Sequence, residues 1–329
     1  MKHIIMEGPK RSKVIDVPDV TITDDQILVH QKYVGVCMSE HYDWSVAKEG
    51  QAFGHEPMGI VKEVGKNVTE FKVGDRVSGL WGNTLPGGGG MVEYAAVDPK
   101  QEIVVKLPDN VRDEDAILEP LSCLMSAVSK VKLDMPGVTV AVVGCGYMGC
   151  GAISLLKMKG AYVVAIDILK ESLEDAKRYG ADEGYLVDEF KEKFAPHGFS
   201  DFKGYDLVME WGETNESLDF AINITATCGQ LCIGAYHTGG KRLVDVQQLN
   251  IKAIDCLSTH PRERNLNRDG AILAAKLLGT GAWEFKNIPV KIYPMNRFDE
   301  AQEELELKHG KYMKAIIDMR MLDGEPYII

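Results

Sequence analysis

Up to about Lys106, short runs of alternating apolar and polar residues are separated by glycine, asparagine and other turn residues. Runs of this length, bounded by turn residues, are typical of β-strands joined by tight connections. We therefore expect a compact, mostly β unit, with strands near residues 27–31, 59–64, 75–80 and 91–97.

A different pattern begins at Val138, where continuous runs of valine, isoleucine and leucine alternate with amphipathic segments. Fully apolar strands with helices between them indicate a parallel sheet that is covered on both faces. The sequence thus predicts a doubly wound α/β domain of the Rossmann type. Its expected strands are 138–143, 162–166, 206–210 and 231–234, and its expected helices are 149–159, 170–179 and 216–225.

The two units are joined by a helical region. An acidic start at Asp113 predicts one helical run, a second helix is expected at 121–130, and Asp134-Met-Pro-Gly then breaks the chain. Beyond about Arg264, periodicity predicts a helix, a strand, a second helix and a last strand, but does not decide which unit they join. Their ranges are 269–278, 290–293, from 299 onward, and 314–318.

A glycine motif opens the α/β unit. Gly144-Cys145-Gly146-Tyr147-Met148-Gly149 follows a predicted strand and precedes a predicted helix. In a dinucleotide site these glycines allow a tight turn, a close approach of the pyrophosphate, and close packing of helix on strand. The next strand ends in Asp167, whose carboxylate can bind the ribose hydroxyls and would repel a 2′-phosphate, so NAD is favoured over NADP. The alternative is that the glycines only form a turn and Asp167 caps the next helix.

Charge and composition exclude several partners. The 329 residues carry 37 Lys and Arg against 49 Asp and Glu, a net charge of −12, with no local basic run, so nucleic acid and anionic membranes are poor partners. The uncharged stretch 138–156 contains four glycines and is typical of strand, turn and helix, not of a membrane span. Seven cysteines without disulfide-framework spacing favour reduced thiols and a cytoplasmic location.

Three polar features of the first half contain possible zinc ligands: Cys37, the pair His55-Glu56, and Glu119. Cysteine, histidine and glutamate all bind zinc, and a catalytic zinc has three protein ligands and one open position. Each residue alone has an ordinary explanation, since a lone cysteine is often a small buried apolar residue and a lone glutamate often starts a helix.

Taken together, the order and context of these motifs resemble the zinc-containing medium-chain dehydrogenase/reductase family, and its polyol dehydrogenase branch in particular. The resemblance covers essentially the whole chain, including Gly54-His55-Glu56 and Gly74-Asp75-Arg76-Val77. It implies a GroES-like catalytic domain at 1–130, an NAD-binding domain at 131–264, and a segment at 265–329 that returns to the catalytic domain. It also implies a homodimer or homotetramer.

The resemblance assigns roles to the polar residues. Cys37 and His55 match metal ligands, Glu56 matches an adjacent carboxylate that can approach the metal, and Glu119 matches the third ligand, with Cys123 as the fallback. Glu40 matches a residue that orients the histidine through its far ring nitrogen.

Two departures from the family pattern affect these expectations. The segment Ser78–Gly90 lacks the cluster of four cysteines that forms the family's second, structural zinc site, so we predict one zinc per chain. The family often places a histidine five residues after the ligand cysteine, whereas here His41 is at the fourth position. Ser39 is therefore the expected first proton carrier and His41 a second.

The function that this resemblance implies is transfer of a hydride to NAD from a secondary alcohol of a polyol, inositol or sugar derivative. A lyase or epimerase that uses tightly bound NAD as a transient oxidant is an alternative. A non-catalytic nucleotide-binding protein is a third, although a binding role would need none of the metal-site residues. Trp44, Trp81 and Tyr94 either line a sugar pocket or belong to the core, while His260 and Arg262 either contact substrate or lie in a solvated loop.

Overall fold

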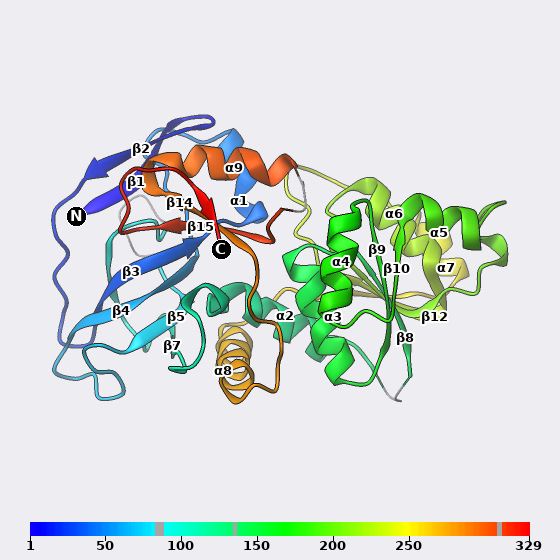
Figure 1. The fold of residues 1–329 in the computed structure, drawn as a ribbon, viewed down its shortest axis with the longest axis horizontal. Helices are drawn as coiled ribbons and strands as arrows, with labels where there is room; N and C mark the ends of the chain where they lie inside the picture. The colour runs from blue at the N-terminus through cyan, green and yellow to red at the C-terminus, as the bar shows by residue number, and fades with distance from the viewer. Residues whose placement is uncertain (83–88, 134–136, 308–310) are drawn as a thin grey trace.

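A computed structural model of the chain describes residues 1–82, 89–133, 137–307 and 311–329, and has two sheets in separate lobes (Figure 1). One lobe contains a six-stranded parallel sheet and the other an eight-stranded mixed sheet. Part of the segment Ser78–Gly90, namely 83–88, and most of the predicted break at Asp134–Gly137 lie outside the described residues.

The parallel sheet has the strand order β10-β9-β8-β11-β12-β13. The order reverses between β8 and β11, so the connections that follow these two strands leave toward opposite faces and form the crevice in which α/β sheets bind ligands. Helices cover both faces of this sheet (Figure 1). The strands are β8 (Thr139–Val143), β9 (Tyr162–Asp167), β10 (Glu183–Leu186), β11 (Tyr205–Glu210), β12 (Thr225–Ile233) and β13 (Asp255–Ser258). The helices are α3 (Tyr147–Met158), α4 (Lys170–Arg178), α5 (Val187–Phe194), α6 (Asn215–Ile224) and α7 (Val246–Ile251), with a 3₁₀ turn η2 (Phe199–Asp201).

The mixed sheet combines strands from both ends of the chain. Its order is β16-β14-β15-β3-β4-β5-β7, and β6 also pairs with β3. The strands are β3 (Ile27–Gly35), β4 (Glu56–Val64), β5 (Arg76–Leu80), β6 (Tyr94–Val97), β7 (Ile103–Lys106), β14 (Val290–Pro294), β15 (Lys314–Asp318) and β16 (Tyr327–Ile328). A separate hairpin, β1 (Lys2–Gly8) and β2 (Arg11–Asp16), completes this lobe and was not predicted.

Helix α2 (Leu118–Lys130) lies between the lobes and packs on α3, on α8 (Arg264–Thr280) and on strands of the mixed sheet (Figure 1). One hydrophobic cluster includes residues of α2, α3, α8 and β8, so the lobes share a core at this point. The remaining elements of the mixed-sheet lobe are α1 (Met38–Ser45), α9 (Phe298–Leu307) and the 3₁₀ turns η1 (Asp113–Asp115) and η3 (Met295–Arg297).

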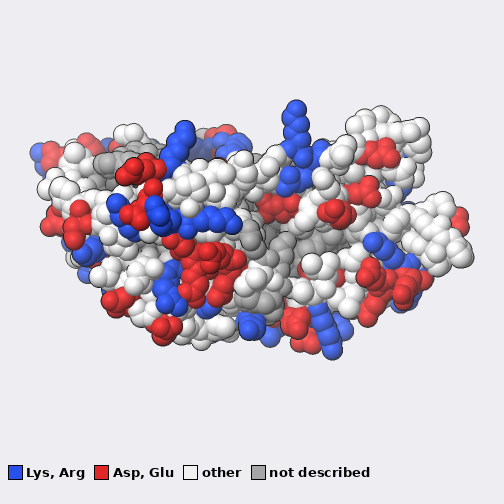
Figure 2. Space-filling view, turned by 90° about the horizontal axis from the view of Figure 1, so that it is seen from above, with Lys and Arg blue, Asp and Glu red and all other residues white. Residues whose placement is uncertain are grey.

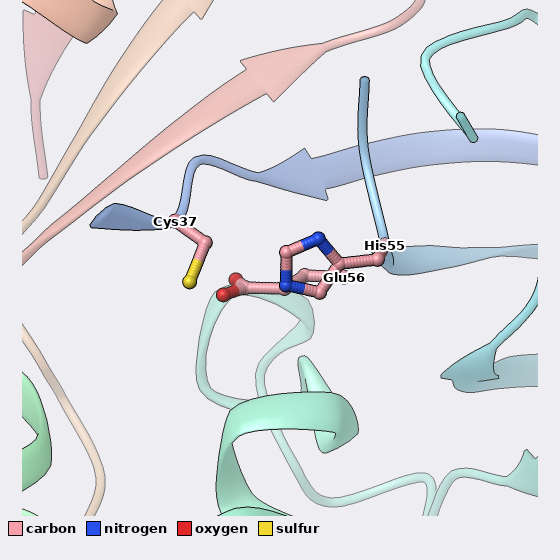
Figure 3. A group of neighbouring side chains, drawn as sticks. All are labelled: Cys37, His55 and Glu56. Carbon is pink, nitrogen blue, oxygen red and sulfur yellow. The ribbon is translucent and has the colours of Figure 1, made fainter. Parts of the chain in front are cut away.

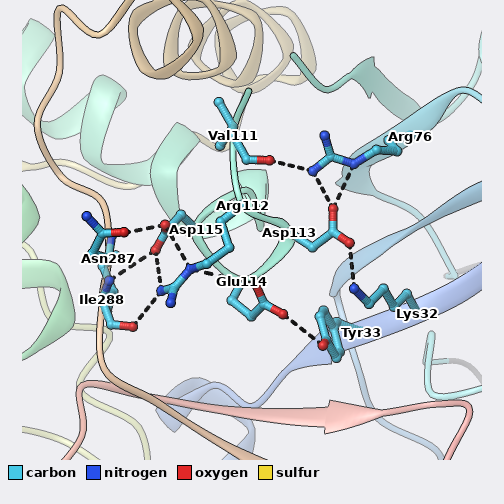
Figure 4. A network of polar contacts seen from close by, with 10 residues as sticks. All are labelled: Lys32, Tyr33, Arg76, Val111, Arg112, Asp113, Glu114, Asp115, Asn287 and Ile288. Atoms are coloured by element: carbon cyan, nitrogen blue, oxygen red, sulfur yellow. Dashed lines mark hydrogen bonds and ion pairs between the residues drawn. The ribbon is translucent and has the colours of Figure 1, made fainter. Parts of the chain in front are cut away.

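The helical run expected from Asp113 is only the short turn η1, because its acidic side chains make tertiary contacts (Figure 4). The Asp115 carboxylate is 2% exposed and accepts hydrogen bonds from the backbone N–H groups of Asn287 and Ile288 and from Arg112. Asp113 binds Lys32 and Arg76 in the mixed sheet. The turn that leads into α2 is therefore tied to β3, to β5 and to the chain before β14.

The interpretation of Trp44, Trp81 and Tyr94 as pocket residues is wrong. Trp44 is fully buried and donates to Asp299, and Trp81 is 1% exposed and donates to Gln31, so both indoles belong to the core of the mixed-sheet lobe. Tyr94 stacks on the His30 ring on a strand surface. A buried indole usually has a hydrogen-bond acceptor for its N–H, and here each of the two has one.

Charge is mixed over the surface. In the view of Figure 2, lysine and arginine alternate with aspartate and glutamate, and form no continuous basic surface among the described residues. Across the described residues, none of the helices has the length and apolar character needed to cross a membrane.

Candidate metal and nucleotide sites

Cys37, His55 and Glu56 converge beside the end of β3 (Figure 3). Cys37 lies between β3 and α1 as the N-cap residue of this helix, while His55 immediately precedes β4 and Glu56 is its first residue. Antiparallel pairing of β3 with β4 sets Gly35 opposite Glu56 and so brings the three residues together. One ligand atom from each lies within 4.8 Å of the others.

Gly35 provides the space for the Glu56 carboxylate. A Cβ at Gly35 would lie 1.9 Å from Oε2 of Glu56, closer than any real contact. The glycine in the Gly35-Val36-Cys37 motif is therefore required by the close approach of this carboxylate.

Lys314, the first residue of β15, neutralises Glu56. Its Nζ lies 2.8 Å from Oε1 and 2.5 Å from Oε2 of Glu56, and it also donates to the carbonyl of Val36. The Glu56 side chain is 1% exposed, and a buried carboxylate needs such a partner. Sequence analysis missed this lysine, because a charged first residue of an apolar strand gives no signal of its contact.

Glu40 orients His55. One oxygen of Glu40 lies 2.7 Å from Nδ1 of His55 and also accepts the N–H of Gly54, so Nε2 is left for the metal group. Burial opposes the charged form of the imidazole, but the charge of Glu40 and the contact with Cys37 outweigh it and raise the pKa of His55 well above its ordinary value.

The predicted proton carriers lie on the first turns of α1. Ser39 lines the cavity described below and donates to Sγ of Cys37 at 3.2 Å. His41 lies against Trp44, with 5.2 Å between the ring centroids, and is not among the residues that line this cavity.

Glu119 and Cys123, one turn apart on α2, also line the cavity, but neither belongs to the compact group of three. The thiol of Cys123 lies 3.5 Å from the Glu119 carboxylate. Burial, then the charges of Glu119 and Cys37, raises the pKa of Cys123 well above its ordinary value. The Cys123 thiol is therefore a neutral donor beside Glu119 in this state.

This donor set fits zinc. A thiolate, an imidazole nitrogen and carboxylate oxygens are the ligands that Zn²⁺ takes in proteins. Two of these side chains are also held by a neighbour, since Glu40 contacts His55 and Lys314 contacts Glu56. Among the described residues it is the one cluster of this kind with such geometry.

The glycine motif has the geometry of a dinucleotide turn. Gly144 has a φ of +88°, and a Cβ there would lie 2.9 Å from the backbone of Trp211 and Gly212. A Cβ at Gly149 would lie 2.0 Å from the Gly144 carbonyl. At Gly146, in contrast, a Cβ would meet nothing within 4 Å, so the backbone beside it is open to a ligand. The turn thus fits a pyrophosphate at the start of α3.

Asp167 ends β9 and is held by the turn itself. It accepts hydrogen bonds from the N–H groups of Cys145, at 2.6 Å, and Leu169, at 2.8 Å, and it lines the cavity. The helix that follows has Leu169 at its N-cap, so capping does not explain Asp167. Lys170 is exposed and is not among the lining residues.

A single cavity of about 520 Å³ connects the metal group to the glycine turn. Tyr147 and Met148 of the motif line it, as do Trp211 after β11 and Tyr236 after β12. Trp211 was also missed by sequence analysis, since an indole after a buried strand is as easily a core residue. One continuous cavity can hold a dinucleotide and a small substrate beside the metal group.

Two family models match the sequence. "Alcohol dehydrogenase GroES-like domain" matches residues 23–109, and "Zinc-binding dehydrogenase" matches residues 148–265. A relative named "Probable D-xylulose reductase A" from Neosartorya fischeri is 30% identical, over 95% of this chain and 95% of its own. Sorbitol dehydrogenase from Bacillus subtilis is 27% identical, over 96% of this chain and 97% of its own.

The fold is also similar to solved structures. An oxidoreductase/dehydrogenase of unknown specificity from Escherichia coli, described as involved in membrane biogenesis, superposes with a TM-score of 0.81 at 21% identity, covering 96% of this chain and 98% of its own. At this identity the likeness shows the fold alone.

Proposed function

The chain belongs to the zinc-containing medium-chain dehydrogenase/reductase family, and we propose that it oxidises a secondary alcohol of a polyol, inositol or sugar derivative with NAD. The observation that carries this proposal is the single cavity that contains both the cysteine, histidine and glutamate group and the open face of the glycine turn. The polyol substrate is supported by relatives named as sorbitol dehydrogenase and xylulose reductase.

As the resemblance implies, we assign the metal to Cys37, His55 and Glu119, which lines the same cavity but lies outside the compact group. Glu56, within that group, is the neighbouring carboxylate that can approach the metal. Bound zinc supplies a positive charge that favours the alkoxide form of an alcohol, and bound NAD⁺ accepts a hydride. Lys314 holds the Glu56 carboxylate in place, and Glu40 fixes the ring of His55.

The chain's own residues align the reaction and move the proton. Ser39 is the proposed first proton carrier: its oxygen would accept the proton of the substrate hydroxyl while its own hydroxyl hydrogen, which here points to Sγ of Cys37, passes to the next carrier. His41 is the proposed next carrier. Gly144, Gly146, Tyr147, Met148 and Gly149 hold the pyrophosphate.

Asp167 is the proposed ribose ligand, and it favours NAD over NADP because its carboxylate would repel a 2′-phosphate. Its position is supported by the two backbone donors that fix it at the cavity wall. Exposed Lys170, the nearest lysine in sequence, gives no built site for a phosphate there.

The alternative of a lyase or epimerase that returns the hydride to its substrate uses the same residues. The relatives reported above are named as reductases and dehydrogenases, which favours net oxidation and reduction.

The test is NADH formation against a panel of polyols, inositols and sugar acids, with the metal content of the protein measured in parallel. We expect turnover that requires about one zinc per chain and is lost in Cys37→Ala but kept in the control Cys228→Ala, which changes an exposed cysteine. Protein that contains zinc and binds NAD, but forms no NADH from any compound, would refute the dehydrogenase and support the hydride-returning alternative.

We also propose one zinc per chain, a homodimer or homotetramer, and a cytoplasmic location. The seven free cysteines support a reducing compartment. The division into domains at 1–130, 131–264 and 265–329 is supported by β14, β15 and β16, which lie in the mixed sheet. Size-exclusion chromatography with light scattering will decide the oligomeric state.

A further inference from the structure

Thr259 and His260, at the start of the loop 259–262, line the cavity and are held by hydrogen bonds from neighbouring elements. Thr259 is 2% exposed and donates to the carbonyl of Ile233 at the end of β12, while its own carbonyl accepts from Ser126 on α2. Lys130, also on α2, donates to the carbonyl of His260. Of the two residues for which the sequence left a solvated loop open, His260 therefore lines the cavity, whereas Arg262 is exposed to solvent.

The His260 ring presents a hydrogen-bond donor to the cavity. Neither ring nitrogen of His260 has a hydrogen-bond partner among the described residues. The two differ in exposure, because Nδ1 is buried and Nε2 is not. Burial, then the charges of Arg262 and Lys130, lowers the pKa of His260, so the ring is neutral near pH 7. Because an enclosed N–H without an acceptor is costly, the single proton belongs on Nε2.

Tyr236 supplies a second donor next to His260. The two ring centroids are 5.8 Å apart, and both residues line the cavity that contains the metal group. Arg262 donates to the phenol oxygen of Tyr236 at 2.6 Å, which leaves the phenol hydrogen available to another acceptor.

Arg262 is exposed and does not itself line the cavity, but its bond to Tyr236 places a positive charge beside the lining residues Tyr236 and His260. Within the part of the chain that the structure describes, neither Arg262 nor Lys130 forms an ion pair with a carboxylate. The acidic neighbour Glu263 is engaged elsewhere, since it accepts the first N–H groups of α8. Carboxylates outnumber cations in this chain, whose net charge is −12, so two neighbouring cations without a carboxylate partner are unusual.

We propose that His260, Tyr236 and Arg262 form a recognition site for an anionic group on the substrate, a carboxylate or a phosphate. All three offer donors, and a charge-assisted bond from a guanidinium strengthens with a charged acceptor. The substrate is then a polyol acid or a polyol phosphate in preference to the neutral polyol. This inference rests on the proposed function and narrows its substrate class.

The test compares matched sets with the same carbon chain: a neutral alditol, the corresponding aldonate and the corresponding alditol phosphate, of five and six carbons. We expect kcat/KM for one anionic class to exceed that of the neutral alditol by about tenfold or more, as one charge-assisted bond gives. The class that is preferred distinguishes a carboxylate site from a phosphate site. Equal values for the neutral and anionic members would overturn the proposal.

Substitutions of Arg262 and His260 test whether these residues cause the preference for an anionic substrate. Arg262→Gln and His260→Gln should lower kcat/KM by about tenfold for the anionic substrate while changing the neutral alditol little. The control Arg268→Gln, at an exposed arginine on α8 that pairs with Asp269, should change neither. An equal loss on neutral and anionic substrates would show a role in folding or chemistry and would also overturn the proposal.

A binding measurement keeps this inference separate from the reaction. Titration of the aldonate and the alditol phosphate into the NAD-bound protein by calorimetry should show binding that is weakened in Arg262→Gln. If no compound yields NADH but this binding is present, the proposed dehydrogenase fails and the anion site stands. If the anions bind no better than the neutral alditol, the anion site fails whatever the activity.

Discussion

The turn before α2 depends on one buried carboxylate, and its substitution gives a sharp test of the structure. Each oxygen of Asp115 accepts two hydrogen bonds, Oδ1 from Arg112 and the N–H of Ile288, and Oδ2 from Arg112 and the N–H of Asn287. In Asp115→Asn the shape is kept, but the amide NH₂ would face two donors and the charge opposite Arg112 would be lost.

Two lost bonds to a charged acceptor would cost several kcal/mol if all were buried, although Arg112 keeps Glu114, at 3.7 Å, and the carbonyl of Ile288 as partners. Arg112 is one-third exposed, which reduces this, and we expect a loss of about 3 kcal/mol. At about 2 cal/mol/K per residue, unfolding of the 329 residues as one unit has an entropy of about 0.7 kcal/mol/K. The expected decrease in Tm is therefore about 4 °C.

Differential scanning calorimetry of the zinc-loaded protein measures this decrease. The matched control is Asp109→Asn, which makes the same chemical change at an exposed position in the preceding connection and should shift Tm by less than about 1 °C. If Asp115→Asn unfolds within about 1 °C of the wild type, the carboxylate does not hold the turn and the reasoning is refuted.

Three further comparisons test the charge of Asp113, the glycine turn and the choice of the third metal ligand. Burial raises the pKa of Asp113, but the hydrogen bonds and charges of Lys32 and Arg76 outweigh burial and lower this pKa below its ordinary value. The charged carboxylate therefore stabilises the fold above about pH 4, and this contribution is lost as the pH falls through the lowered pKa. The difference in Tm between wild type and Asp113→Asn should thus narrow from pH 6 to pH 3; a constant difference would contradict the assignment. Gly146→Ala should keep the wild-type Tm and weaken NADH binding, measured by fluorescence, by about tenfold, whereas Gly149→Ala should lower Tm itself. Glu119→Gln should lower the affinity for zinc by about 10-fold or more, and Cys123→Ala should leave this affinity unchanged. Competition with a chelator of known zinc affinity measures both values. The reverse result would make Cys123 the third ligand.

The fold was largely predictable because its strands and turns leave local signals. The apolar runs of β8, β9 and β11 and the glycine turn between β8 and α3 required only periodicity and spacing. The strands β3, β4 and β5 were located, but β3 and β4 were predicted too short, since β3 extends to Gly35 through residues that carry no alternation of their own. The hairpin of β1 and β2 was missed for the same reason.

The site was less accessible to sequence reasoning, because its contacts join segments far apart in the chain. Resemblance identified Cys37, His55 and Glu56, and the structure brings them together. Nothing in the sequence indicates that Lys314 would meet Glu56, or that Ser126 and Lys130 would fix the loop that carries His260. Each of these contacts follows from tertiary packing and not from local pattern.

The pairing of β15 with β3 determines the order in which a newly made chain can fold. The six strands of the parallel sheet lie within residues 139–258, so that lobe is complete long before synthesis ends. The mixed sheet must wait, since Ile316 pairs with Gly35 across most of the chain. Contacts of such sequence separation form late and slowly. Until Lys314 leaves the ribosome, the Glu56 carboxylate lacks the cation that pairs with it in the fold, and the edge of β3 that pairs with β15 is open. During this interval all strands of the parallel sheet are present, while an open strand edge of the mixed sheet can pair with another chain.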